Sequence, residues 1–437
     1  MSALDMARTP GVEMPLMRSL RSLAAGLLVA ACLAVPATAH ATTIPSLRPP
    51  LSQADVAGSV GYLTRTYGVS PAEAMRRLEL QRTAASLQDV LARDYPDTYA
   101  GAWIDQEHGG MLMIGSTRPA TLTTALAAIA DREHIRVVPA RFSRRSLETV
   151  AAQVSARLHL PVAQAPVIDD VHNRVVLHNR AATAAATQGM QAAEVAVVPA
   201  GNTRVPKACT LDNCTPPMRG GLKLYIFDAL TSRPAWIWFC TSGFNVHGSN
   251  GWQYTVTAGH CFAGEGNYAD NNRHWAGYYQ ALTLAGFFDD YPADGMIAPY
   301  VVTGGVNYAG YWLGNQPANG VWDTTRGSLL PITGTYDYAQ IGVGWIVCST
   351  GARSLNTRCG SVVDKDGGIV TDICTQGGDS GGPLFSELDN RAYGVLSWGN
   401  NPNDNCPSGV RSGFSPLSVL FSTVQAKSGI SFAVNTA

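Results

Sequence analysis

The sequence predicts a large all-β domain, an antiparallel sandwich or barrel, preceded by a small α/β unit. Beyond residue 219, short runs of β-forming residues, such as residues 251–259 and 391–399, alternate with turn residues. Many short strands in one segment are typical of sandwiches and barrels. Upstream of that segment the residue pattern is helical, and no cysteine occurs between Thr42 and Lys207. The two parts of the chain therefore differ in structure.

Composition argues against several classes of protein. The chain has 437 residues, which is long for one domain, and only 14% of them are charged, with a net charge of −1. A nucleic-acid-binding protein would carry a basic surface, and a disordered chain would have a high net charge. We expect a folded protein without a nucleic-acid or membrane-surface partner.

The N-terminus has the pattern of an export signal. Arg18 and Arg21 precede an apolar run at residues 23–35, and small residues follow it. A membrane-spanning helix is the weaker interpretation, because the run falls short of the about 20 residues that a bilayer needs and a proline follows it. Residues 1–41 are thus predicted to be the signal peptide of a secreted protein, with a lipoprotein processed at Cys32 as a minor alternative.

Residues 42–205 predict two rounds of helix followed by strands. Residues 70–95 have apolar residues at helical spacing, with Ser70 as the N-cap and a proline at the first helical position. Residues 99–117 alternate like a hairpin with a Gly-Gly turn. The second round comprises a helix at 146–160 and strands at 165–179.

A boundary is predicted at residues 206–218, because Pro and Gly gather there as in an exposed linker or processing site. The β domain then covers residues 219–437. Helical periodicity at 416–429 indicates a C-terminal helix that closes the domain.

Eight cysteines follow the signal. An even set in an exported chain predicts disulfides, although eight cysteines allow 105 connectivities and spacing alone does not choose among them. Zinc binding is the competing interpretation, but no Cys-x-x-Cys pair or histidine cluster accompanies them. The eight are Cys209, Cys214, Cys240, Cys261, Cys348, Cys359, Cys374 and Cys406.

Ser380 stands among glycines in the stretch CTQGGDSGGP at 374–383. A surface turn is the simple interpretation, but glycines also leave backbone N–H groups uncovered around a reactive serine. A nucleophilic serine needs a histidine base, and the β domain offers His247, His260 and His274. His260 is the candidate, because it ends an apolar strand and precedes Cys261, whereas the other two lie in polar loops.

Three blocks together resemble the chymotrypsin-type serine proteases: TAGHC at 257–261, GDSGGP at 378–383 and SWG at 397–399. Three residues separate Cys374 from the Gly-Asp-Ser block, a spacing similar to that of streptogrisins and α-lytic protease. Residues 42–205 likewise resemble the prosegment of that bacterial branch. The resemblance implies a double six-stranded antiparallel β-barrel with a C-terminal helix, preceded by a small α/β prosegment.

The resemblance also implies a catalytic triad. Ser380 would be the nucleophile, His260 the base and Asp294 the orienting acid, with Asp289, Asp290 and Asp337 as weaker matches for the acid. The backbone N–H groups of Gly378 and Ser380 would form the oxyanion hole.

Further expectations concern substrate binding and disulfides. An apolar residue before the scissile bond is expected, although Asp372 imitates the acid that selects basic residues in trypsin-type enzymes. The implied substrate-binding residues are Thr375, Gln376, Leu396, Ser397, Trp398 and Gly399. The implied disulfides are Cys240–Cys261, Cys348–Cys359 and Cys374–Cys406, with Cys209 and Cys214 left over.

The sequence thus predicts a secreted serine endopeptidase made as a preproenzyme, whose prosegment assists folding and inhibits until it is cleaved. Protein or peptide substrates and the chain's own prosegment are the expected partners of a monomer. No cofactor and no metal is implied, and calcium binding by loop acids stays open. A catalytically inactive binding protein on the same fold is the main alternative. An exported esterase is a weaker one, because the alternating pattern of a parallel sheet is missing.

Overall fold

The computed structural model describes most of the chain beyond residue 49. The predicted signal peptide with Cys32, the linker at 206–218 with Cys209 and Cys214, and His274, Asp289 and Asp290 lie outside the described residues. The described ranges are 50–160, 165–178, 195–198, 219–227, 236–262, 268–270, 275–277, 292–300, 302–303, 306–307, 319–365, 367–401 and 405–436.

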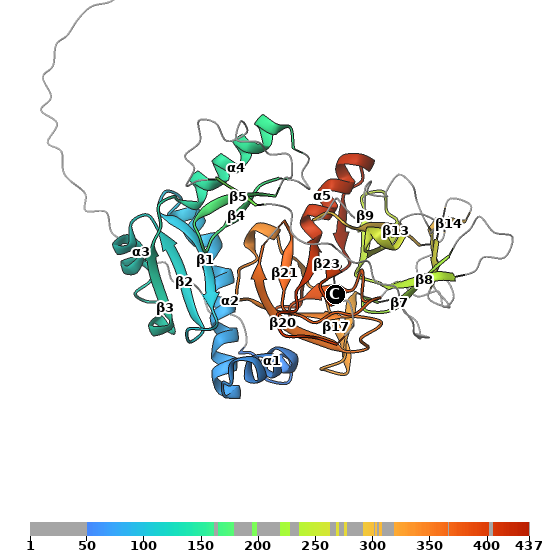
Figure 1. Ribbon diagram of the computed structural model, residues 1–437, viewed down its shortest axis with the longest axis horizontal. Helices are drawn as coiled ribbons and strands as arrows, with labels where there is room; N and C mark the ends of the chain where they lie inside the picture. Colours follow the sequence, from blue (N-terminus) through green and yellow to red (C-terminus); the bar gives the residue numbers. More distant parts are fainter. Residues whose placement is uncertain are drawn as a thin grey trace, which may run out of the picture. The chain divides into compact units, whose positions relative to one another are not determined.

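The N-terminal region, residues 50–198 as far as described, contains both predicted rounds of helix and strand (Figure 1). Ser70 caps the long helix by accepting a hydrogen bond from the Glu73 N–H, and Pro71 takes the first helical position. The first round comprises α1 (Ala57–Tyr67), α2 (Pro71–Asp94), β1 (Tyr99–Asp105), β2 (Met111–Ser116), α3 (Pro119–Ala125), η1 (Arg132–His134) and β3 (Ile135–Pro139). The second comprises α4 (Arg144–Leu158), β4 (Val167–Asp169), β5 (Arg174–His178) and β6 (Val195–Val198).

Each round of the N-terminal region forms its own three-stranded sheet, in the orders β1-β2-β3 and β4-β5-β6. In both sheets the first pair of strands is antiparallel and the second pair is parallel. The hairpin turn between β1 and β2 is built as predicted, with Gly109 at φ 84° and Gly110 at φ 60°, which L side chains rarely adopt.

As far as the structure describes it, the first half of the β domain contains two four-stranded sheets with the orders β13-β10-β9-β25 and β12-β11-β7-β8, and a short hairpin β14-β15. Its elements are β7 (Lys223–Phe227), β8 (Trp236–Thr241), β9 (Asn245–Gly248), β10 (Gln253–Thr257), η4 (Gly259–Phe262), β11 (Tyr268–Asp270), β12 (Trp275–Gly277), β13 (Met296–Pro299), β14 (Val302–Thr303), β15 (Val306–Asn307) and the C-terminal β25 (Phe432–Val434).

The second half is a closed six-stranded barrel. Strands follow the order β23-β22-β19-β20-β21-β24, and β24 pairs back onto β23, so the sheet has no open edge between them. Its elements are β16 (Gly320–Asp323), β17 (Ser328–Pro331), β18 (Gly334–Thr335), η7 (Tyr338–Gln340), β19 (Ile346–Thr350), β20 (Thr357–Asp364), β21 (Ile369–Thr371), β22 (Pro383–Phe385), β23 (Arg391–Gly399), β24 (Ser412–Pro416) and α5 (Leu417–Ser428). This architecture confirms the predicted chymotrypsin-like fold.

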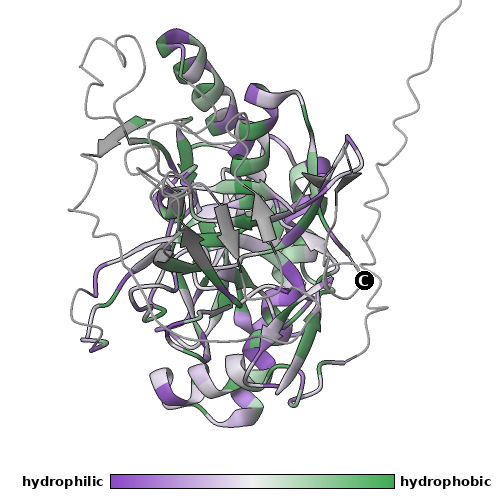
Figure 2. Ribbon diagram, turned by 90° about the vertical axis from the view of Figure 1, so that its right-hand side faces the viewer, coloured by the Kyte–Doolittle hydropathy of each residue, from purple (hydrophilic) through white to green (hydrophobic). Residues whose placement is uncertain are grey.

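The barrel and the N-terminal region share a hydrophobic core. Leu80 of α2 and Ile104 of β1 belong to one buried cluster with Leu384 and Phe414 of the barrel. Apolar segments follow the strands in the middle of the view, and hydrophilic stretches are more frequent at its periphery (Figure 2). Among the described residues, no helix is long and apolar enough to span a membrane.

Candidate active site

Ser380 lies in a tight turn between Cys374 and β22. The Gly382 N–H donates to the Asp379 carbonyl at 2.7 Å, and the Gly381 N–H donates to the Leu396 carbonyl of β23 at 2.8 Å. Gly381 has φ 82°, and a Cβ there would lie 2.0 Å from the Thr257 Oγ1. Glycine is therefore required both by the backbone conformation and by the close approach of β10.

The Asp379 carboxyl group holds this turn from inside. It is buried and accepts hydrogen bonds from three backbone N–H groups, those of Gln376 at 2.8 Å and of Arg353 and Ser354 at 2.9 Å each. Burial raises the pKa of Asp379, and the hydrogen bonds oppose that shift. The sequence pattern around Ser380 does not by itself indicate that Asp379 builds the turn.

Two N–H groups of the turn have no acceptor among the described residues. Gly378 has φ 109°, and in the part of the chain that the structure describes the N–H groups of Gly378 and Ser380 make no hydrogen bond, whereas the intervening Asp379 N–H donates to the Gln376 carbonyl. These are the two donors that the sequence analysis assigned to an oxyanion hole.

His260 lies in η4, directly after β10, and contacts Asp294 twice. The Asp294 Oδ1 accepts the His260 backbone N–H at 2.9 Å, and the Asp294 Oδ2 lies 2.8 Å from the His260 Nδ1. Both residues are buried, at 7% and 2% exposure, so water hardly screens the pair. Of the described acids weighed for this position, Asp294 contacts His260, whereas Asp337 caps η7 by accepting from the Ala339 N–H.

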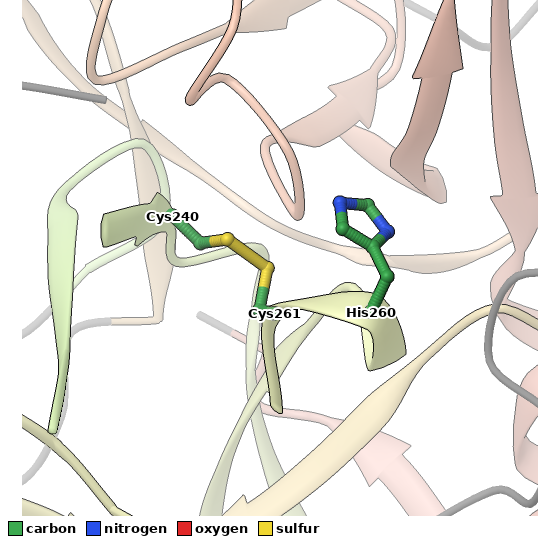
Figure 3. Close-up of side chains that lie close together, drawn as sticks. All are labelled: Cys240, His260 and Cys261. Carbon is green, nitrogen blue, oxygen red and sulfur yellow. A yellow bond between two sulfur atoms is a disulfide. The ribbon is translucent and has the colours of Figure 1, made fainter. Parts of the chain in front are cut away.

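A disulfide anchors the turn that carries His260. Figure 3 shows the imidazole rising from one side of the turn while the Cys261 side chain leaves on the other side to join Cys240 of β8. These three side chains are close enough to share a metal ion, but the bond between the two sulfur atoms removes the thiolates that would bind one. His247, by contrast, is exposed and lies 3.0 Å from the Asn435 Oδ1.

Thr241, the residue after Cys240, holds the Ser380 turn beside the turn that carries His260. Its N–H donates to the Ser380 carbonyl at 2.7 Å, and its hydroxyl donates to the Gly378 carbonyl at 2.7 Å. A Cβ on Gly381 would lie 2.8 Å from the Ala258 N, two residues before His260. The serine turn therefore packs against the histidine turn, although the Ser380 hydroxyl forms no hydrogen bond within the described part of the chain.

Ser397 has a contact that the sequence analysis missed. It was assigned to the substrate-binding strand, but its hydroxyl donates to the Asp294 Oδ2 at 2.6 Å. Asp294 thus accepts hydrogen bonds from the His260 backbone and from Ser397 besides contacting the imidazole. No local signal in the SWG block indicates this contact, because 103 positions separate the two residues.

The other residues assigned to substrate binding lie on β23 and on the serine turn. The Thr375 Oγ1 lies 2.8 Å from the Ser412 Oγ, and a Cβ added to Gly399 would lie 2.8 Å from the same Thr375 Oγ1. Leu396 is buried in the barrel core and Trp398 is half-buried. Gln376 supplies its backbone N–H to Asp379.

β23 has a partially open edge near these residues. β22 pairs with β23 as far as Val395, whereas β24 continues along the opposite edge to Gly399. The segment 397–399 therefore extends past the end of β22.

Asp372 is occupied elsewhere. Its carboxylate accepts hydrogen bonds from the Ser361 N–H at 2.7 Å and from the Tyr62 hydroxyl of α1 at 2.5 Å. The three disulfides implied by the resemblance are all present, namely Cys240–Cys261, Cys348–Cys359 and Cys374–Cys406.

Comparisons with known proteins find similarity to serine proteases. The Trypsin family matches residues 349–418, which include Ser380 and Ser397. Serine protease 1 of Rarobacter faecitabidus is 25% identical over 363 residues, covering 79% of this chain and 59% of that protein. Serine protease 1 and Serine protease 2 of Drosophila melanogaster are each 34% identical over 128 residues, covering 29% of this chain and 43% of each relative.

The chain thus spans about half the length of the curated relatives it matches. Among solved structures, Nocardiopsis protease (NAPase) aligns at a TM-score of 0.36 and 18% identity, over 49% of this chain and 98% of that chain. The match at residues 349–418 and the closed barrel thus make this chain similar to the trypsin-like serine proteases, which have the chymotrypsin fold.

Proposed function

We propose that this protein is a secreted serine endopeptidase of the streptogrisin and α-lytic protease branch, made with an N-terminal prosegment. The observation that carries the proposal is the buried His260–Asp294 pair, whose histidine lies on a turn that packs against the turn of Ser380. An activated serine needs this combination of a base and an acid that orients it.

The proposed reaction runs through an acyl-enzyme. The Ser380 hydroxyl attacks the substrate carbonyl carbon, and the His260 Nε2 takes the hydroxyl proton, because Nδ1 is engaged by Asp294. The same Nε2 then returns the proton to the leaving amine. Asp294 orients and stabilises the imidazolium, and water then hydrolyses the acyl-enzyme with His260 again accepting and returning the proton.

The oxyanion formed in this reaction would accept hydrogen bonds from the N–H groups of Gly378 and Ser380. Both donors are without a protein acceptor in the described chain, so no internal bond has to break when the oxyanion forms. Preorganised donors of this kind are worth about 2.7 to 4 kcal/mol of barrier each.

The substrate backbone would add a strand beside residues 397–399, past the end of β22. The side chain before the scissile bond would then lie near Thr375 and Gly399, a lining without charge. Within the protease domain the Asp372 carboxylate accepts a hydrogen bond from the Ser361 N–H, which favours an apolar over a basic substrate residue.

The N-terminal region is proposed to be a prosegment that assists folding. Its side chains complete hydrogen bonds of the barrel: the Gln81 amide contacts both the N–H and the carbonyl of Ile346, at 2.7 and 3.3 Å. The Ile104 N–H donates to the Val343 carbonyl at 2.9 Å. A barrel built from strands distant in sequence forms slowly, and a template that holds β19 in place would lower the barrier.

Labelling with a fluorophosphonate probe, followed by peptide mapping, tests the proposal. We expect modification of Ser380 in the processed protein and none in the Ser380→Ala variant. If the folded, processed protein is not labelled, the triad does not activate the serine, and the inactive binding protein becomes the better interpretation. Cleavage of chromogenic peptides only after Arg or Lys would contradict the apolar preference.

A further inference from the structure

A carboxylate of the β domain caps a helix of the N-terminal region. Helix α1 begins after Val56, whose side chain supplies no cap. The Glu387 Oε2 accepts the Ser59 N–H at 2.8 Å and the Ser59 hydroxyl at 2.6 Å, and the Oε1 accepts the Gly58 N–H at 3.3 Å. Gly58 and Ser59 are the second and third residues of the helix, whose N–H groups a local cap would normally bind.

The first turn of α1 is shaped for this contact. A Cβ on Gly58 would lie 2.7 Å from the Cys359 Sγ and 2.9 Å from the Glu387 Oε1, so only glycine lets the helix approach. Ser59 is fully buried and Glu387 is 3% exposed. Docking of α1 therefore removes Glu387 from water.

A second carboxyl group lies behind Glu387. The Thr325 Oγ1 lies 2.7 Å from the Asp323 Oδ1 and 2.9 Å from the Glu387 Oε1. A hydroxyl has one proton, so it can donate to only one of two carboxylates. For both short contacts to be hydrogen bonds, one carboxyl group must carry a proton. Protonated Glu387 satisfies this, because it donates to Thr325, which donates to Asp323.

In the part of the chain that the structure describes, no cation pairs with these two acids. Among the described residues, neither Asp323 nor Glu387 forms an ion pair, and the nearby Arg326 pairs with Asp55 at 3.2 Å. The other neighbours of Glu387 do not titrate, since Cys348 and Cys359 are joined in a disulfide. The other carboxylate that α1 contacts is Asp372, through Tyr62.

We propose that Asp323, Thr325 and Glu387 form a proton-linked latch, so that docking of α1 on the β domain takes up one proton and weakens as the pH rises. This inference deepens the proposed function, because it rests on the N-terminal region being a prosegment that must leave the protease domain. The latch makes the binding of the N-terminal region to the protease domain depend on pH, at a site separate from the catalytic triad.

The direction follows from the protonation of Glu387 in the docked state. Burial, aided by the charge of Asp323, raises the pKa of Glu387, although the hydrogen bonds from Ser59 oppose the shift. Undocking returns the carboxyl group to water and toward its ordinary pKa, about 4.3. The latch therefore stabilises the docking of α1 fully below that ordinary pKa. This stabilisation is lost as the pH rises through the raised pKa of docked Glu387.

Hydrogen exchange of the α1 amides in the full-length Ser380→Ala chain tests the latch. Protection factors, corrected for the intrinsic pH dependence of exchange, report the local opening of the helix. Between pH 4.5 and 8 we expect protection of the α1 amides to fall, within the titration window, by about tenfold per pH unit for one proton. In the Glu387→Gln background, where the amide replaces the protonated acid, we expect protection that stays high and flat.

Tyr62→Phe is the matched control. It removes the contact with the other carboxylate, Asp372, so protection should be lower at every pH with an unchanged slope. If Glu387→Gln fails to fold, Asp323→Asn serves instead and should move the titration to lower pH, because the charge that raises the proton affinity of Glu387 is gone.

A flat profile in the chain with the native latch would overturn the proposal, as would an unchanged profile in the Glu387→Gln or Asp323→Asn variants. These measurements need no catalysis. Failure of fluorophosphonate labelling would therefore refute the proposed activity alone, and a flat exchange profile in a chain whose parent is labelled would refute only the latch.

Discussion

The Ser397 hydroxyl donates to the Asp294 Oδ2 at 2.6 Å, the same oxygen that lies 2.8 Å from the His260 Nδ1. A carboxylate shared in this way is fixed in position by a second donor. Ser397 is therefore a positioning residue for the triad besides a part of the proposed substrate-binding strand.

The Ser397→Ala variant should lower kcat/KM. Hydrogen bonds to charged groups contribute about 1.5 to 3 kcal/mol, which corresponds to a loss of about 10- to 150-fold. If the loss arises because Asp294 is no longer held in position, the pH profile of kcat/KM will also shift. Ser415→Ala is the control, because that serine is also buried and its hydroxyl has no partner among the described residues. Equal losses in both variants would contradict the positioning role.

The Asp294→Asn variant should fold and lose most of its activity. The amide keeps the shape of the acid but removes the charge that stabilises the imidazolium, and in triads this change costs about 10⁴-fold in kcat. Single-turnover kinetics would measure the loss of activity, and circular dichroism would show whether the variant is folded. Asp337→Asn, which changes only the cap of η7, should retain activity. A fully active Asp294→Asn enzyme would remove Asp294 from the triad.

The Gly381→Ala variant should lose far more stability than Gly409→Ala. Both glycines have positive φ, 82° and 76°, so both substitutions carry a backbone penalty of about 1 to 2 kcal/mol. Only Gly381 is also crowded, with the Thr257 Oγ1 2.0 Å from the Cβ position, whereas nothing lies within 4 Å at Gly409. Denaturant unfolding of the two variants measures the difference, and equal midpoints would show that the serine turn can yield.

Because of Lys365, the free energy of unfolding should rise as the pH increases from 8 to 9.5. Burial lowers the pKa of this lysine to about 8, while the unfolded chain keeps the ordinary value of about 10.4. The unfolded state binds more protons in that range, so the free energy of unfolding rises with pH, by about 1.5 kcal/mol in all. The Lys365→Met variant should lack this rise in a denaturant titration repeated at each pH. A rise of the same size in the variant would assign it to another group.

Much of the local structure can be predicted from the sequence. Ser70 and Pro71 start α2 and the Gly109-Gly110 turn joins β1 to β2, because capping and turn formation depend on residues within a few positions of each other. The serine turn follows the same logic, since the run of glycines around Ser380 permits its positive φ angles and bare N–H groups. The likeness to a known family added the disulfide pairs, which spacing alone does not determine.

The tertiary structure decided which distant side chains meet. Asp294 reaches His260 across 34 positions, Ser397 reaches Asp294 across 103, and Glu387 caps α1 across 328. No local propensity encodes such contacts. They exist because closing the barrel and docking the N-terminal region bury these polar groups together, and a buried carboxylate is stable only where donors or a proton satisfy it. The sequence by itself determined the turns, the helix ends and the reactive residue types, and the packing of the strands decided how those residues are combined into a site.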